Sequence, residues 1–378
     1  MTAQLYASSP HAAPDEFYLP PASVPKQPGQ LVRAEPLERG VPAAARAWRI
    51  LYTTTDHIGE PTLSSGVVTV PAQGGTNLPV VSWANGTKGV QPRCALSLAD
   101  NPYEDGPSRA RTTMLDAGWA IVATDYPGLD TSGPHPYLVP QAEAAAILDA
   151  TRAAGQLKQF TLSERTVFWG HSQGGHAALS AAAYAPDYAP EFTVLGTAAM
   201  APASDLPLLA ASVADTAAGK VISSYIATSW DELYPQLDIL QGLQGSTTRS
   251  LERIGANCFS GSEVLSALAE ASQLFEPIFP AAALDGPIGD RLMENSAPQQ
   301  VPGPVFLAQG GGDSLVTPAM QRSWRDAACT QGTQIFYREY PGLEHMGLVG
   351  EESSLNDDLV SWTLNLDQGS SVEDNCRS

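Results

Sequence analysis

The 378-residue sequence has few basic residues and no long apolar run. No stretch approaches the roughly 18–20 apolar residues that a helix needs to cross a bilayer, so stable membrane insertion is not expected. Lys and Arg number 20 against 40 Asp and Glu, which gives a formal net charge of −20. Such an acidic surface repels phosphate backbones and anionic lipids, which argues against nucleic-acid partners. Hydrophobic residues make up 43% of the chain, so a disordered protein is excluded and a sizeable core is expected.

The four cysteines do not form a metal-binding pattern. Cys94, Cys258, Cys329 and Cys376 contain no C-x-x-C pair, and no histidine lies at ligand spacing from them, so we expect no metal site. Their even number fits two disulfides in an oxidising compartment, with four reduced thiols in a cytosolic protein as the alternative. Residues 1–31 lack the basic-then-apolar signature of a secretion signal. Either the protein is intracellular or this numbering begins after a removed signal.

Short apolar runs alternate with Ala-rich segments along most of the chain. Helices are expected at residues 141–154 and 174–185, the second ended by Pro186. Because apolar runs without alternation suit strands that are buried on both faces, this order predicts an α/β fold with a mostly parallel sheet flanked by helices. The expected strands are residues 47–55, 66–70, 78–84, 119–124, 166–169, 192–198, 305–308 and 334–340.

The chain divides into three predicted regions. The proline-rich residues 1–45 are expected to form an extended N-terminal arm. Residues 46–201 and 300–378 carry the strand and helix pattern of the main α/β domain. Residues 202–299 show helical apolar periodicity, with Gly and Pro between the segments and no clear strand. An insertion of about 100 residues is too long for a loop, so we expect a helical cap or lid over the sheet.

The sharpest motif is GHSQGG at residues 170–175, between an apolar run and an Ala-rich helix. In a nucleophile elbow, a serine stands on a sharp strand-to-helix turn, and glycines keep Cβ atoms out of that turn. Ser172 would lie at a helix N-terminus, where backbone N–H groups favour a developing oxyanion. G-x-S-x-G alone is a modest signal, and a plain Gly/Ser turn is the alternative. The flanking strand and helix make Ser172 the candidate nucleophile.

A serine hydroxyl needs a base, and the base needs an orienting acid. In this topology they follow in the order Ser, Asp or Glu, His, each after a late strand. The penultimate expected strand leads through a Gly-rich segment to Asp313, and the last one leads to His345. Asp290 and Asp326 are rival acids, but neither follows a strand. The predicted catalytic triad is therefore Ser172, Asp313 and His345.

Two backbone N–H groups are predicted to bind the oxyanion. One belongs to Gln173, the residue after the nucleophile. The other is expected after the third strand, where an HGGG-type motif lies in this topology. Here residues 78–84 lead into Asn85, Gly86 and Thr87, so the N–H of Gly86 or Thr87 is the candidate donor. The alternative is that this N-G pair forms an ordinary turn.

Taken together, these motifs resemble the secretory lipase family of α/β-hydrolases, the Candida antarctica lipase A-like group, and in particular its actinobacterial branch. Asn85 departs from the bacterial pattern, where histidine precedes Gly-Thr. The resemblance implies an α/β-hydrolase fold, a helical lid inserted before the acid-bearing strand, and the disulfides Cys94–Cys258 and Cys329–Cys376. The matching stretches are residues 17–21, 85–87, 94–97, 125–129, 135–138 and 170–175, with the segments that end at Asp313 and His345.

The leading interpretation is a secreted serine ester hydrolase, a lipase or carboxylesterase. His345 would deprotonate Ser172 for attack on the ester carbonyl, Asp313 would orient the imidazole, and water would release the acyl group. No cofactor is implied, and the expected partner is a small-molecule or lipid ester. A serine peptidase or amidase on the same fold is one alternative. A non-catalytic binding protein is another, although the three triad residues occur in the required order.

Overall fold

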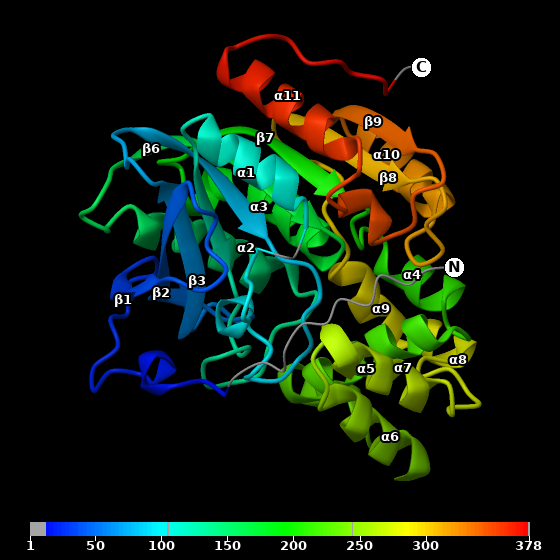
Figure 1. Ribbon diagram of the computed structural model, residues 1–378. Helices are drawn as coiled ribbons and strands as arrows, with labels where there is room; N and C mark the ends of the chain where they lie inside the picture. The colour runs from blue at the N-terminus through cyan, green and yellow to red at the C-terminus, as the bar shows by residue number, and fades with distance from the viewer. Residues whose placement is uncertain (1–12, 104–105, 244, 377–378) are drawn as a thin grey trace.

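The computed structural model describes residues 13–103, 106–243 and 245–376. Its centre is a nine-stranded mixed sheet with the strand order β1-β2-β3-β5-β4-β6-β7-β8-β9 (Figure 1). The strands from β4 to β9 run parallel, and β1 to β3 extend one side of the sheet by antiparallel pairing. The strands are β1 (Leu31–Leu37), β2 (Ala45–Thr55), β3 (Pro61–Pro71), β4 (Leu78–Ala84), β5 (Ala120–Thr124), β6 (Leu162–His171), β7 (Thr193–Met200), β8 (Pro304–Gly310) and β9 (Gln334–Tyr340).

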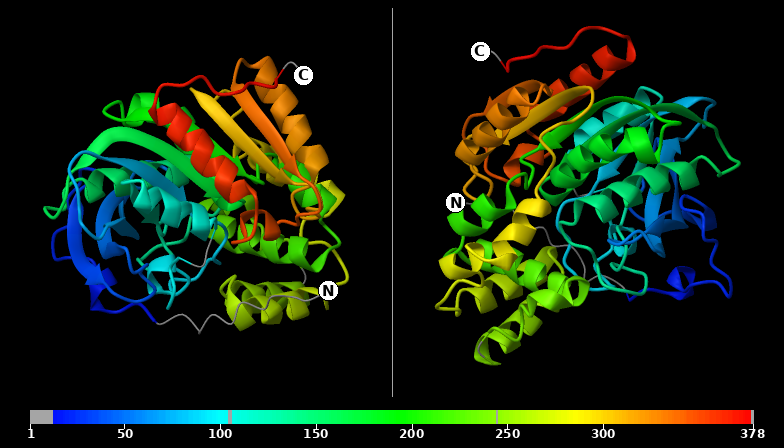
Figure 2. Two further views of the ribbon diagram at one scale, coloured as in Figure 1. Left: turned by 45° about the horizontal axis from the view of Figure 1, so that its top comes forward. Right: turned by 180° about the vertical axis from the view of Figure 1, so that it is seen from behind.

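Helices cover both faces of this sheet. They are α1 (Ser108–Asp116), α2 (Pro140–Ala154), α3 (Gln173–Tyr188), α10 (Pro318–Thr330) and α11 (Leu355–Asp367). Helices α1 and α11 lie on one face, and α2, α3 and α10 lie on the other (Figure 2). Short 3₁₀ turns are η1 (Glu16–Tyr18), η2 (Leu96–Leu98), η3 (Pro235–Leu237) and η4 (Gly347–Val349).

Strand β6 illustrates why the predicted strands lack alternation. Val167 and Trp169 pack into the core with α1 and α11, whereas Phe168 packs on the opposite face with α2 and α3. All three side chains are fully buried. A strand covered on both faces needs apolar residues at every position, which is the pattern that the sequence carries.

Part of the expected N-terminal arm belongs to the folded core. Residues 1–12 of the arm lie outside the described part of the chain. Leu31–Leu37 forms β1, which pairs antiparallel with β2, and Phe17 and Tyr18 in η1 are buried. The later half of the arm supplies a sheet strand because its backbone pairs with the edge of β2.

Helix α3 corrects one detail of the prediction. The helix does not end at Pro186 but continues to Tyr188, and Ala189 still donates its N–H to the carbonyl of Ala185. Pro186 lies in the last turn, where its missing N–H removes one hydrogen bond without disturbing a following turn. Proline therefore marks the end of this helix only approximately.

The chain between β7 and β8 forms helices. They gather to one side of the sheet, at the lower right of Figure 1. The disulfide Cys94–Cys258 joins this segment to the loop after β4, and Cys329–Cys376 joins α10 to the C-terminal segment, which is the pairing that the resemblance implies. The helices are α4 (Leu206–Ser212), α5 (Ala217–Leu233), α6 (Gly245–Gly255), α7 (Gly261–Ala271), α8 (Ala281–Leu284) and α9 (Pro287–Glu294).

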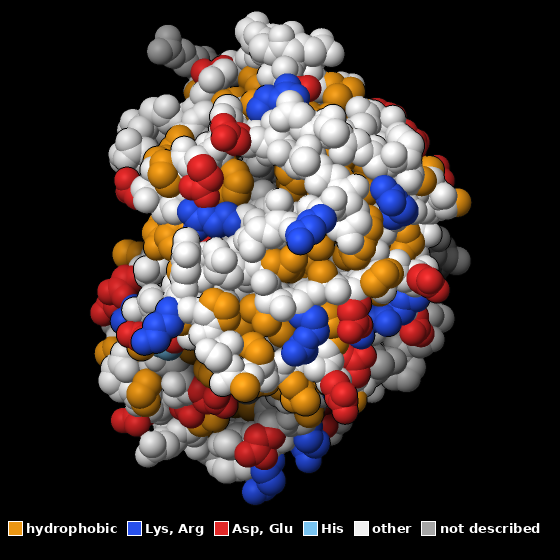
Figure 3. Space-filling view, turned by 90° about the vertical axis from the view of Figure 1, so that its left-hand side faces the viewer, with side chains coloured by type: hydrophobic (Ala, Val, Ile, Leu, Met, Phe, Trp, Pro, Cys, Tyr) orange, Lys and Arg blue, Asp and Glu red, His pale blue; other side chains and the backbone are white. Residues whose placement is uncertain are grey.

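One face of the molecule carries side chains of both charge signs (Figure 3). Figure 3 shows the side of the molecule on the left of Figure 1, where Lys and Arg side chains lie among Asp and Glu. Several arginines pair with carboxylates across elements, such as Arg109 with Asp357 and Arg165 with Asp367. Among the described residues, no helix is long and apolar enough to span a membrane.

Candidate active site

Ser172 stands on the turn between β6 and α3 in a strained backbone conformation. Its φ is 58° and its ψ is −119°, in a region that residues with a side chain rarely adopt. Its N–H donates to the carbonyl of Met200 at 2.9 Å, and its own carbonyl accepts the N–H groups of His176 and Ala203 at 3.1 Å. These bonds to β7, α3 and the start of the inserted segment hold the turn in place. Ser172 is thereby presented at the N-terminus of α3.

The glycines of the motif are required by close backbone approach. A Cβ on Gly170 would lie 1.9 Å from the carbonyl oxygen of Gly174, and one on Gly174 would lie 1.9 Å from that of Ala84. Neither clash can be relieved by moving a side chain, because both neighbours are backbone atoms. The turn therefore packs directly against the end of β4, where the predicted oxyanion loop begins.

Asp313 and His345 meet at the carboxyl ends of β8 and β9. The Nδ1 atom of His345 lies 2.6 Å from Oδ2 of Asp313, whose side chain is fully buried. The other carboxylate oxygen of Asp313 accepts the N–H groups of Leu315 and Val316 at 2.9 Å. These donors fix the carboxylate, so His345 donates from Nδ1, and its Nε2 carries no hydrogen when the ring is neutral. The tautomer follows from the hydrogen bonds.

His171 connects this pair to the elbow. Its ring lies 4.6 Å from the His345 ring between centroids, and its Nε2 lies 3.1 Å from the His345 carbonyl oxygen. Because β6, β8 and β9 are parallel, Ser172, Asp313 and His345 all follow strand ends at the same edge of the sheet. The structure thus brings the three predicted triad residues to one place.

The predicted oxyanion loop lies against the same turn. The carbonyl of His171 is 3.3 Å from the position that a Cβ on Gly86 would take. The Thr87 hydroxyl bonds the Tyr137 hydroxyl at 2.8 Å, which fixes the Thr87 side chain. In the described part of the chain, no backbone hydrogen bond uses the N–H of Gly86, Thr87 or Gln173. All three candidate donors are therefore available.

Asn85, which replaces the histidine of the bacterial pattern, has a structural contact. Its Nδ2 donates to the carbonyl of Thr124 at 2.6 Å, and its own carbonyl accepts the Tyr126 hydroxyl at 3.1 Å. The first bond uses the side chain of Asn85 and the second its backbone carbonyl, and both join the end of β4 to the end of β5. Asn85 is buried. Its side chain therefore anchors the loop that carries Gly86 and Thr87.

Sequence reasoning missed Glu143. This residue lies in the Ala-rich helix α2 with its side chain fully buried, and it bonds Gln173 and His176 behind the nucleophile turn. The available signal was a lone acidic residue in the segment QAEAAAI, where every neighbour is apolar on the buried side. His135, which matches the family pattern, is also buried and lies 3.3 Å from Nε2 of Gln173.

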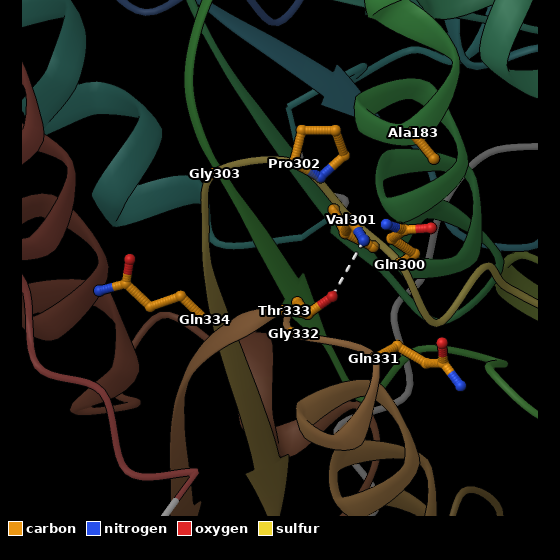
Figure 4. Close-up of a pocket in the computed structure, with 9 residues that line it drawn as sticks. All are labelled: Ala183, Gln300, Val301, Pro302, Gly303, Gln331, Gly332, Thr333 and Gln334. Carbon is orange, nitrogen blue, oxygen red and sulfur yellow. Dashed lines mark hydrogen bonds between the residues drawn. The ribbon is translucent and has the colours of Figure 1, made fainter.

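Two further observations concern metal binding and a surface pocket. In the described residues, no group of three or more His, Cys, Asp or Glu side chains is arranged to hold a metal ion. A surface pocket of about 540 Å³ is lined by Ala183 and residues 300–303 and 331–334 (Figure 4). This pocket lies where β8 and β9 begin, whereas Asp313 and His345 follow the ends of those strands. The pocket is therefore remote from the triad.

Comparison with known proteins matches residues 111–355, more than half of the chain, to the family model described as Secretory lipase. Among curated relatives, a Mycobacterium tuberculosis protein named "Probable inactive lipase" is 29% identical over 208 residues, 51% of this chain and 46% of that protein. "Lipase A" of Moesziomyces aphidis is 26% identical over 203 residues, 50% of this chain and 43% of the relative. The chain thus spans about half the length of the curated relatives it matches.

Among solved structures, Candida antarctica lipase A in its closed state superposes with a TM-score of 0.78. The match covers 96% of this chain and 88% of that one, at 19% identity. Likeness at this identity concerns the fold, and it confirms the prediction of an α/β-hydrolase fold.

Proposed function

Because the chain belongs to the secretory lipase family, we propose that it is a serine ester hydrolase with Ser172, Asp313 and His345 as its triad. The observation that carries this proposal is the contact between the buried Asp313 carboxylate and His345, 2.6 Å apart, near the strained turn of Ser172. A buried acceptor, an oriented imidazole and a serine at a helix N-terminus are the parts that acyl transfer requires.

The reaction follows from this arrangement in two halves. His345 Nε2 takes the proton of the Ser172 hydroxyl as Oγ attacks the ester carbonyl, and the carbonyl oxygen becomes an oxyanion. The N–H of Gln173 and that of Gly86 or Thr87 bind this oxyanion. Collapse expels the alcohol, which receives the proton from His345 and leaves an acyl-enzyme. Water then attacks the acyl carbon by the same route, releasing the acid and restoring Ser172.

Active-site labelling tests this proposal. A fluorophosphonate probe is expected to label the protein once, on Ser172, and the variant Ser172→Ala is expected to take up no label and to lose ester hydrolysis. A non-catalytic role is the second candidate, because one relative is named an inactive lipase. A folded wild-type protein that neither reacts with the probe nor hydrolyses p-nitrophenyl esters would favour that second role.

Residues 202–299 are proposed to cap this site and to set the acyl-chain preference. Leu206, Tyr225 and Trp230 are buried, whereas Phe275 is 96% exposed. Rates measured over a series of acyl-chain lengths test this proposal. A lipase is expected to prefer long chains and to accelerate above the solubility limit of the substrate, whereas a steady fall beyond short chains indicates an esterase. The family and the two disulfides also support a secreted location.

A further inference from the structure

We propose that Glu143 is a positioning residue for the nucleophile turn. Through Gln173 and His176 it fixes the first turn of α3, which presents Ser172 and the Gln173 N–H to the substrate. This inference rests on the proposed function and adds a residue from α2 that does not touch the substrate. Glu143 would act by holding the oxyanion donor at the correct angle and distance.

Three donors converge on the buried carboxylate of Glu143. Its Oε1 accepts the backbone N–H of Leu138 at 3.1 Å and Nε2 of Gln173 at 2.7 Å. Its Oε2 lies 2.8 Å from Nδ1 of His176. Gln173 and His176 are three residues apart on α3, so they share one face of that helix. The Glu143 carboxylate therefore binds the first turn of α3 through two side chains, those of Gln173 and His176.

The amide group of Gln173 has both of its hydrogens committed. One is donated to Glu143, and the other faces Nε2 of His135 at 3.3 Å. His135 donates from Nδ1 to the carbonyl of Pro127 at 3.0 Å, which leaves Nε2 as an acceptor. Burial lowers the pKa of His135 to about 4, so the imidazole stays neutral and keeps that role. Rotation of the Gln173 side chain would break two buried hydrogen bonds, and this restricts the backbone that carries the N–H.

His176 also contacts the inserted segment between β7 and β8. Its Nε2 lies 2.8 Å from the carbonyl oxygen of Asn295, the residue that caps α9 at its C-terminus. The two ring nitrogens of His176 therefore contact an oxygen on α2 and an oxygen at the end of α9. Loss of the Glu143 carboxylate would remove the α2 partner of both Gln173 and His176, while the contact of His176 with Asn295 would remain.

Asp149 provides a matched control on the same helix. Its side chain is also fully buried, and it also accepts three donors, from Thr54, Tyr188 and Arg152. None of these donors belongs to the first turn of α3. Loss of either carboxylate is expected to destabilise the fold, but only loss of Glu143 is expected to disturb the oxyanion donor.

The experiment compares Glu143→Gln with Asp149→Asn in the full chain, using a soluble p-nitrophenyl ester. For Glu143→Gln we expect kcat to fall about 10- to 100-fold with KM within about twofold, because a small misplacement of the donor acts on the transition state. Affinity for a trifluoromethyl ketone, which forms a tetrahedral adduct at the serine, is expected to fall by the same factor. For Asp149→Asn we expect kcat and ketone affinity close to the wild type.

A second variant keeps the test informative if Glu143→Gln does not fold. Gln173→Ala retains the backbone N–H and removes only the link, so it is expected to lose kcat by a similar factor. Combined with Glu143→Gln in a folded protein, it is expected to add little further loss, because both changes break one connection.

The two proposals fail in different ways. An active wild type with full kcat in both Glu143→Gln and Gln173→Ala would overturn the positioning role alone. An equal loss of kcat in Asp149→Asn would also overturn it, by showing general damage. A wild type that neither turns over esters nor labels at Ser172 would overturn the proposed function and this inference together.

Discussion

At the scale of single residues, the buried carboxylates near the candidate triad are held by several hydrogen-bond donors each, whereas the buried oxygens Asn85 Oδ1 and Gln309 Oε1 have no partner in the structure. Asp313 is held by two backbone N–H groups and His345, and Glu143 is held by three donors. A buried carboxylate without such donors would cost several kcal/mol. These donors fix both carboxylates, so loss of one donor is expected to alter the position of the groups that share its carboxylate.

His135 predicts a dependence of stability on pH. Its pKa falls from 6.5 to about 4 because of burial, so between these values the unfolded chain binds a proton that the folded chain does not. Stability that is present above pH 6.5 is therefore lost as the pH falls toward 4. For this group alone, the loss between pH 7 and pH 5 is about 2 kcal/mol. Urea unfolding of the wild type and of His135→Gln at both pH values measures it.

The variant His135→Gln is expected to be less stable than the wild type at pH 7, because it loses the packing of the imidazole. Its deficit relative to the wild type is expected to shrink by about 2 kcal/mol at pH 5. A deficit that is the same at both pH values would show that His135 takes up its proton equally in the folded and unfolded chains.

At the scale of elements, the turn from β6 to α3 depends on glycine. Gly174→Ala would place a Cβ 1.9 Å from the carbonyl oxygen of Ala84, so the helix must move away from β4. We expect a loss of about 3 kcal/mol or more in the free energy of unfolding, from overpacking against rigid backbone. Gly155→Ala, at the end of α2, is the matched control, because its nearest neighbour would lie at an ordinary 3.4 Å. Thermal unfolding of both variants checks this, and equal stability would contradict the crowding.

The two disulfides are expected to differ in their contribution to stability. Cys94–Cys258 closes a separation of 164 residues and Cys329–Cys376 one of 47. In the chain-entropy model, the longer loop adds about 1 kcal/mol more to the free energy of unfolding. Paired Cys→Ala variants of each bridge, unfolded in guanidinium chloride, measure the difference. A larger loss from the shorter bridge would contradict this expectation.

The elements that sequence could predict are those whose signal is local. The runs at 78–84 and 334–340 match β4 and β9 in full. Strand β4 is apolar because both of its faces are covered, whereas the edge strand β9 alternates buried with more exposed residues. Strand β1 was missed because its pairing depends on the free edge of β2, which no local pattern reveals. The predicted end of α3 at Pro186 was too early, because the last turn of a helix tolerates proline.

At the scale of the whole molecule, the same distinction applies to the site. Ser172, Asp313 and His345 each follow a strand with its own motif, so the fold topology leads to them from sequence. Glu143 carries no motif, because its importance depends on α2 packing against α3, a contact between residues 30 or more apart.

The central claim is that hydrolysis passes through an acyl group on Ser172, and rapid-quench measurement tests it most directly. With p-nitrophenyl acetate in excess, we expect a burst of about one equivalent of p-nitrophenol per enzyme where deacylation is slower than acylation. Mass spectrometry of protein quenched in acid is then expected to show one acetyl group on the peptide that contains Ser172, and none in Ser172→Ala. Steady hydrolysis that persists unchanged in Ser172→Ala, with no acetylated Ser172 peptide, would contradict the account.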